Sequence, residues 1–263
     1  MELIDIGVNL TNSRLYHNRN KLKEQAIQAG IHHQIVTGTC LESSIKALQI
    51  CQEDPDYYSC TVGCHPHDAK DFRDTHLAQL KDLANSKSAV AIGECGLDFN
   101  RNYSPQDVQV EVFQQQINLA CQSEMPLFMH QRDAHETLVR ILKPFLGKYI
   151  NGVVHCFTGD KHELKDYLDL GLYVGITGWL CDERRGQELQ EALRYAPLDR
   201  IMFETDAPYL LPRTIRPRPK SNANVPANLP WVVSKAAQIC NQSETELASI
   251  CTENSRRFFN LSQ

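Results

Sequence analysis

The chain has 263 residues, of which 42% are hydrophobic and 22% are charged, and its formal net charge is −5. This length and composition predict a folded globular protein with a sizeable core and exclude a largely disordered chain. The acidic balance argues against a protein that grips nucleic acid over a wide basic face, although a small local site for a phosphate-bearing substrate stays open.

The amino terminus and the cysteines predict a cytoplasmic protein. The opening "MELIDIGVNLTNS" has neither a basic start nor a sustained apolar region, so we do not expect a signal peptide. No run approaches the roughly 20 apolar residues that span a bilayer, so we expect no membrane contact. The ten cysteines include no CxxC pair, and we expect them to be reduced thiols that pack as small hydrophobic side chains.

Short apolar runs bounded by turn residues recur along the chain and predict strands. They lie at 3–10, 33–40, 58–65, 89–96, 126–133, 152–159, 172–179 and 200–207. Helical patterns lie between them, at 41–53, at 104–122 with Ser104 as N-cap and Pro105 at the first helical position, and at 161–171 with Gly171 at the C-cap.

Eight alternating strand and helix units predict a (β/α)8 TIM barrel, an α/β fold, as a single domain over residues 1–263. A doubly wound open sheet is the main alternative. It would usually carry a glycine-rich phosphate loop after its first strand, and Val8-Asn9-Leu10-Thr11 is no such loop.

Side chains that can bind a metal follow five of the predicted strands. They are His65 and His67 after the third, Glu94 at the end of the fourth, His130 on the fifth, His155 on the sixth and Asp206 on the eighth. Strand ends of a TIM barrel share one mouth, so these residues would be neighbours there. A lone histidine at a strand end is more often a core or rim residue, but several together form the ligand set of a divalent metal.

This arrangement explains why an apolar run ends on a carboxylate, since a cation opposite Glu94 keeps it ionised. We predict Glu94, His130, His155 and Asp206 as metal ligands. Glu94 and Asp206 are also the predicted catalytic carboxylates, with Asp206 taking the proton from a metal-activated water.

Three residues are predicted to bind substrate phosphate. His65 and His67 are held near the rim by Pro66. We favour phosphate contact for both, and metal ligation stays open as the alternative. Arg213 opens a basic loop at 211–230 with five prolines and four cations, and phosphate-binding loops commonly follow the last strands of a barrel. A solvated turn with ordinary charges is the alternative for this loop. Arg184 and Arg185, after the seventh strand, form a weaker candidate substrate loop.

Six separated motifs resemble, in order, the TatD family of metal-dependent hydrolases. They are "GCHPHD", "AIGECGLDFNRN", "FMHQRDAHE", "VVHCFTG", "GITGWLCDERRG" and "ETDAPYLLPR". The resemblance implies an amidohydrolase-type TIM barrel and a metal-dependent deoxyribonuclease. It also implies a 3′–5′ exonuclease that prefers single-stranded DNA or RNA, uses magnesium and acts in repair of oxidatively damaged DNA. It carries the family's metal ligands onto Glu94, His130, His155 and Asp206, and its phosphate-side histidine onto His65.

The chain departs from that family at one place. Most members end the first strand on a His-x-His pair, whereas Gly7-Val8-Asn9 stands here. We therefore expect one firmly held ion at Glu94, His130 and His155 with Asp206 close, and any second ion to be weak or to arrive with substrate phosphate. Mg²⁺ is the expected ion, with Mn²⁺ or Zn²⁺ as alternatives.

Two other functions remain open from the sequence. The same site could hydrolyse a carbonyl ester such as aminoacyl-tRNA, because an activated water serves both reactions. The missing His-x-His pair could also indicate a binding protein that has lost catalysis. The intact set of Glu94, His130, His155 and Asp206 argues against this alternative. We expect a monomer with no obligate protein partner.

Overall fold

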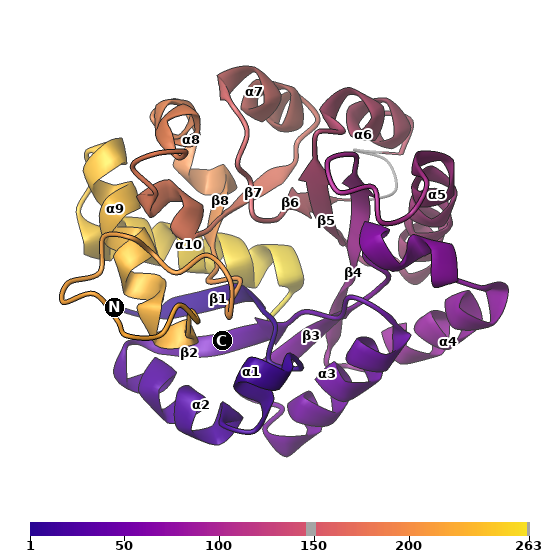
Figure 1. Cartoon of the computed structure of the whole chain (residues 1–263), viewed down its shortest axis with the longest axis horizontal. Coiled ribbons are helices and arrows are strands. Elements are labelled where there is room, and N and C mark those ends of the chain that lie inside the picture. The colour runs from indigo at the N-terminus through magenta and orange to yellow at the C-terminus, as the bar shows by residue number, and fades with distance from the viewer. Residues whose placement is uncertain (146–150, 262–263) are drawn as a thin grey trace. The chain divides into compact units, whose positions relative to one another are not determined.

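A computed structural model describes residues 1–145 and 151–261 of the chain (Figure 1). Its strands are β1 (Leu3–Val8), β2 (Ile31–Val36), β3 (Tyr58–Val62), β4 (Ala89–Asp98), β5 (Leu127–Arg132), β6 (Gly152–Val154), β7 (Tyr173–Ile176) and β8 (Ile201–Phe203). Its α-helices are α1 (Ser13–Tyr16), α2 (Arg19–Gln28), α3 (Leu41–Glu53), α4 (Asp74–Ala84), α5 (Gln106–Ser123), α6 (His135–Leu142), α7 (Lys161–Asp169), α8 (Gln187–Leu193), α9 (Leu229–Cys240) and α10 (Glu244–Phe259). The 3₁₀ helices are η1 (Pro66–Asp71), η2 (Gly178–Cys181), η3 (Leu198–Arg200) and η4 (Pro226–Asn228).

The strands form one sheet in the order β1 to β8, with helices between successive strands. The pairings from β3 to β6 and between β7 and β8 are parallel. All eight predicted strands are present, and the predicted (β/α)8 TIM barrel is confirmed. The chain divides into two compact units, and the single domain over 1–263 stays a prediction.

The first unit comprises residues 1–35, 156–165 and 173–263. In it, the segment after β8 runs beside the end of β1. The backbone N–H of Asp206 donates to the Gly7 carbonyl at 2.9 Å, and that of Asn9 donates to the Ala207 carbonyl at 2.8 Å. Helix α10 packs against both β1 and β8. The ends of the first and last strands are thereby fixed side by side.

The second unit comprises residues 36–155 and 166–172. Helix α3 packs on β3, and α5 packs on β4 and on η1. Strand β4 does not end at Glu94 as predicted but continues to Asp98, with Gly96 beside His130 and Asp98 beside Arg132 of β5. The predicted strand end was wrong because Cys95, Gly96 and Leu97 are buried beyond the charged Glu94 and stay paired with β5.

The start of α5 also differs from the prediction. The helix begins at Gln106 with Pro105 as its N-cap, so Ser104 is not the cap. The hydroxyl of Ser104 instead accepts the Lys70 N–H at 3.0 Å and donates to the His67 carbonyl at 2.9 Å. Ser104 therefore joins the loop before α5 to η1.

Gly171 follows α7 with φ of 76°, which suits the predicted helix end. All ten cysteines are free thiols. Over residues 1–145 and 151–261, none of the helices combines the length and the apolar character needed to span a bilayer.

Candidate metal centre and active site

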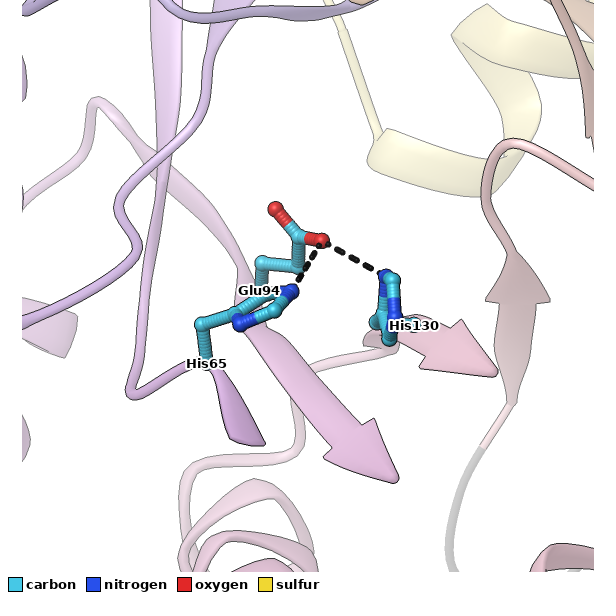
Figure 2. A group of neighbouring side chains, drawn as sticks. All are labelled: His65, Glu94 and His130. Atoms are coloured by element: carbon cyan, nitrogen blue, oxygen red, sulfur yellow. Dashed lines mark ion pairs between the residues drawn. The ribbon is translucent and has the colours of Figure 1, made fainter. Parts of the chain in front are cut away.

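Three histidine rings meet one carboxylate oxygen in the second unit. Glu94 Oε1 lies 3.2 Å from His65 Nε2 and 3.2 Å from His130 Nδ1. The same oxygen lies 2.8 Å from His155 Nε2. Figure 2 shows the first two rings turned toward this oxygen. The structure thus brings together four of the residues that the sequence predicted for the site.

Each of these side chains is set by a strand or by the residues that follow one. His65 follows β3 and is the N-cap of η1, where its Nδ1 accepts the backbone N–H of His67 at 3.1 Å. Glu94 lies within β4, and its N–H donates to the Gly38 carbonyl. His130 lies in β5, and His155 directly follows β6. Carboxyl ends of parallel strands thereby supply all four groups.

Glu94 and His65 are both buried, but the neighbouring side chains offset the effect of burial only at the carboxylate. Burial raises the pKa of Glu94, but His155, His65 and His130 more than offset this and hold it well below its ordinary value. Burial lowers the pKa of His65 to about 4. Near neutral pH the carboxylate is therefore ionised while the ring of His65 is neutral.

A second carboxylate, Asp98, lies on the other side of His130. Its Oδ2 is 3.3 Å from His130 Nε2 and 2.7 Å from His67 Nε2. Burial raises the pKa of Asp98, but hydrogen bonds from His130, the Arg101 backbone and His67 bring it well below the ordinary value. His130 thus lies between two ionised carboxylates, which raise its pKa despite its burial. Carboxylates that bond a metal-ligating histidine fix its orientation and raise its basicity.

Asp98 was not among the predicted site residues, because the fourth strand was predicted to end at Glu94. Residues i and i+4 of a strand point to one face, and this spacing relates Glu94 to Asp98. Extending the predicted fourth strand by four residues, to Asp98, would have identified this carboxylate as a candidate site residue.

Two buried glutamines on α5 are further positioning residues that the sequence analysis missed. Gln116 accepts the Cys64 N–H at 2.7 Å and donates to the Cys64 carbonyl at 2.9 Å. Gln109 accepts the Asp98 N–H at 2.8 Å and donates to the Asp98 carbonyl at 3.1 Å. Each amide satisfies the backbone of a residue at or beside the site. The signal was two amide side chains seven residues apart on the otherwise apolar, buried face of α5.

The first unit holds the remaining predicted ligand. Asp206 is half-buried, and its Oδ1 accepts the side-chain N–H of Asn9 at 2.9 Å. The adjacent Thr205 is bonded to the buried Asp5 through its backbone N–H and its hydroxyl, at 2.9 and 2.6 Å. Asp206 belongs to the first unit and Glu94 to the second. That Asp206 completes the ligand set therefore stays a prediction.

Arg213 makes an ion pair in the first unit. Its guanidinium contacts Glu183, with Nη2 2.7 Å from Oε1, and its Nε lies 3.8 Å from Asp182. Arg184 and Arg185 both pair with Asp182 at 3.0 Å. The two arginine-bearing loops therefore join one cluster of charges. Phosphate binding by Arg213 and by His67 stays a prediction.

The donor set at Glu94 fits a divalent metal. One ligand atom each from His65, Glu94 and His130 lies within 4.8 Å of the others, and His155 reaches the same carboxylate oxygen. Imidazole nitrogens with an ionised carboxylate oxygen are ordinary ligands of Zn²⁺, Mn²⁺ and related ions. A buried carboxylate facing three rings is also the place where a cation removes the cost of burying charge.

Residues 4–260 match the model of the TatD-related DNase family. The chain belongs to this family. It is 47% identical to a protein of Erwinia tasmaniensis named 3′-5′ ssDNA/RNA exonuclease TatD, over 98% of this chain and all of the other. It is 46% identical to a protein of the same name from Pectobacterium carotovorum, over the same shares.

Solved structures agree on the fold. A TatD-family hydrolase from Entamoeba histolytica superposes with a TM-score of 0.90 at 26% identity, covering 100% of this chain and 99% of the other. An amidohydrolase from Saccharomyces cerevisiae superposes with a TM-score of 0.88 at 22% identity, covering 98% and 100%. The predicted family, the barrel and a metal-dependent hydrolase acting as a nuclease are thereby confirmed.

Proposed function

We propose that this chain is a metal-dependent 3′–5′ exonuclease that shortens single-stranded DNA and RNA. The observation that carries the proposal is the meeting of His130 and His155 at one ionised oxygen of Glu94, with His65 beside it. The names of the two bacterial relatives, which match the full length, support the polarity and the substrate.

Glu94, His130 and His155 would hold one divalent ion, with Asp206 as the fourth ligand, and we name Mg²⁺ as that ion. When bound, the ion lowers the pKa of a coordinated water and polarises a phosphoryl oxygen. Asp98 would orient the ring of His130 for this task through its hydrogen bond to Nε2. Asn9 would hold Asp206 through its Oδ1 while Asp206 accepts a proton from the attacking water.

His65 is better suited to donate a hydrogen bond than to bind the ion. Its Nδ1 accepts the backbone N–H of His67, so the proton of the neutral ring stands on Nε2. That N–H points toward Glu94 Oε1. A nitrogen that carries a proton cannot ligate a metal, but it can donate to a non-bridging oxygen of the scissile phosphate. This assignment supports the phosphate role of His65.

His67 and Arg213 would bind phosphates further along the strand. Their present partners, Asp98 and Glu183, keep both side chains oriented until substrate arrives. The proposal also covers a single-domain, monomeric enzyme of the cytoplasm that contributes to repair of oxidatively damaged DNA. Ten free thiols are in keeping with a reducing compartment.

The test is a nuclease assay on end-labelled single-stranded DNA, single-stranded RNA and duplex DNA. The protein is first treated with a chelator, and Mg²⁺, Mn²⁺ or Zn²⁺ is then restored. We expect stepwise shortening from the 3′ end of single strands, fastest with Mg²⁺ and at least a thousandfold slower in Glu94→Gln. The matched control is Glu111→Gln, which alters an exposed glutamate on α5 and should leave the rate unchanged.

Equal cleavage by wild type and Glu94→Gln would refute the proposed site. Shortening from the 5′ end would refute the polarity. If no metal restores cleavage, the nuclease proposal fails, and an aminoacyl-tRNA ester is the next substrate to assay.

A further inference from the structure

Tyr103, in the loop between β4 and α5, presents a large aromatic ring to solvent. Its exposed fraction is 57%, whereas the next residue, Ser104, is completely buried. A buried neighbour fixes the backbone from which the exposed ring projects. Such an arrangement is unusual for a surface loop, in which exposed tips are generally mobile.

The loop is held by a set of hydrogen bonds. Asp98 Oδ1 accepts the backbone N–H groups of Asn100 and Arg101, at 3.0 and 2.8 Å. Asn102 has φ of 50°, and its side-chain amide donates to the Phe99 carbonyl at 2.6 Å. With the two bonds of Ser104 to η1, these contacts order the loop before any ligand binds. A preordered ring costs less conformational entropy when it binds.

The ring of Tyr103 continues the row of imidazoles at the site. Its centroid lies 4.7 Å from that of His67, with the planes at 64°. The His67 ring lies 4.3 Å from that of His65, whose Nε2 faces Glu94. Asp98 anchors His67 in this row. Tyr103 therefore stands two ring contacts away from the proposed scissile phosphate, in the same unit, with part of its ring open to solvent.

The surroundings of Tyr103 suit the binding of one flat ring better than the binding of another protein. Asn100, Arg101 and Asn102 beside it are exposed and polar, so they do not extend the ring into an apolar patch. Protein-binding patches are contiguous apolar surfaces of several hundred Å². A single aromatic ring in a polar, cation-bearing setting is instead the arrangement on which proteins stack the bases of single strands.

We propose that Tyr103 is a stacking platform for the base of the nucleotide that carries the scissile phosphate. The sugar of that nucleotide would bridge the distance between its base on Tyr103 and its phosphate at His65. Only an unpaired base can place its face on Tyr103, since bases of a duplex are already stacked and paired. This subsite rests on the proposed function and would contribute to its preference for single strands.

The test compares two substrates that differ in one base. Both are end-labelled single-stranded DNA, one with a natural 3′-terminal nucleotide and one with an abasic residue there. We expect Tyr103→Ala to lower kcat/KM about tenfold on the natural strand, mainly through a higher KM. On the abasic strand the variant and wild type should have equal kcat/KM. Tyr103→Phe, which keeps the ring, should restore the natural-strand rate.

The matched control is Tyr195→Ala, which removes a tyrosine of similar exposure, 63%, in the segment between α8 and β8. Its kcat/KM should match wild type on both strands. An unchanged natural-strand rate in Tyr103→Ala, or an equal loss on both strands, would overturn the subsite while leaving the nuclease intact. Retained cleavage in Glu94→Gln, or none by wild type with any metal, would overturn the proposed function and the subsite with it.

Discussion

Asp5 is a completely buried carboxyl group in the middle of β1, and its replacement by asparagine tests how the fold holds the segment before Asp206. The carboxyl accepts hydrogen bonds from the Thr205 N–H, the Thr205 hydroxyl and the Gly7 N–H, at 2.9, 2.6 and 3.3 Å. Burial nevertheless raises the pKa of Asp5 from 3.8 to about 7, because the lost hydration of the charged form outweighs these bonds.

This shift makes the free energy of unfolding depend on pH with a definite sign. Below about pH 4, Asp5 is protonated in both the folded and the unfolded chain, and its contribution to stability is fully present. As pH rises toward 7, the unfolded chain releases the proton while the folded chain keeps it, so the free energy of unfolding falls. A difference of about 3 pKa units corresponds to about 4 kcal/mol in total, of which roughly 3 kcal/mol falls between pH 5 and 8.

Asp5→Asn removes this titration while keeping the size of the side chain. The free energy of unfolding of the variant minus that of wild type should therefore rise by roughly 3 kcal/mol between pH 5 and 8. Urea unfolding of chelator-treated protein at pH 5, 6, 7 and 8 measures it. Asp199→Asn, at an exposed position, is the control and should track wild type. A constant difference between Asp5→Asn and wild type across this range would refute the reasoning.

Three further substitutions test the elements that position the site. Gln116→Ala should lower the free energy of unfolding by about 2–5 kcal/mol in urea, because it leaves the buried backbone N–H and carbonyl of Cys64 unpaired. Asp98→Asn should weaken metal binding about 10- to 100-fold in calorimetric titration, because His130 loses a charged partner; unchanged affinity would contradict its positioning role. Gly96→Ala should destabilise by more than about 2 kcal/mol in the same urea assay, because φ is 130° there and a Cβ would collide with the His130 carbonyl.

The fold could be predicted because its signals are local. Each strand was predicted from a short apolar run bounded by turn residues, with helical patterns at 41–53, 104–122 and 161–171 between them, and eight such runs indicated the barrel. Boundaries were less accurate where tertiary contacts decide them. Ser104 is a residue type that is typical of an N-cap, but its hydroxyl bonds the backbone of η1, which is more than thirty residues away in the sequence. A pattern confined to neighbouring residues cannot contain that contact.

The candidate site could be predicted to the extent that barrel topology places strand ends together. Barrel topology alone predicted that His65, Glu94, His130 and His155 are neighbours, which the structure confirms. Topology could not predict which side chains contact one another, in particular that His130 lies between two carboxylates. That feature depends on β4 continuing past Glu94, whereas the prediction ended the strand at the charge of Glu94.

Asp98 also connects the proposed metal ligand His130 with the proposed stacking platform Tyr103. Asp98 bonds the His130 and His67 rings through Oδ2 and the loop backbone through Oδ1. One buried carboxylate therefore bonds the proposed metal ligand His130, the His67 ring beside Tyr103 and the turn that precedes Tyr103. A substitution at Asp98 should consequently raise both the dissociation constant for the metal and the KM for a strand with a natural 3′ end. Tyr103→Ala should raise the KM and leave the dissociation constant for the metal unchanged. Measuring the dissociation constant and the KM in both variants separates metal binding from binding of the strand.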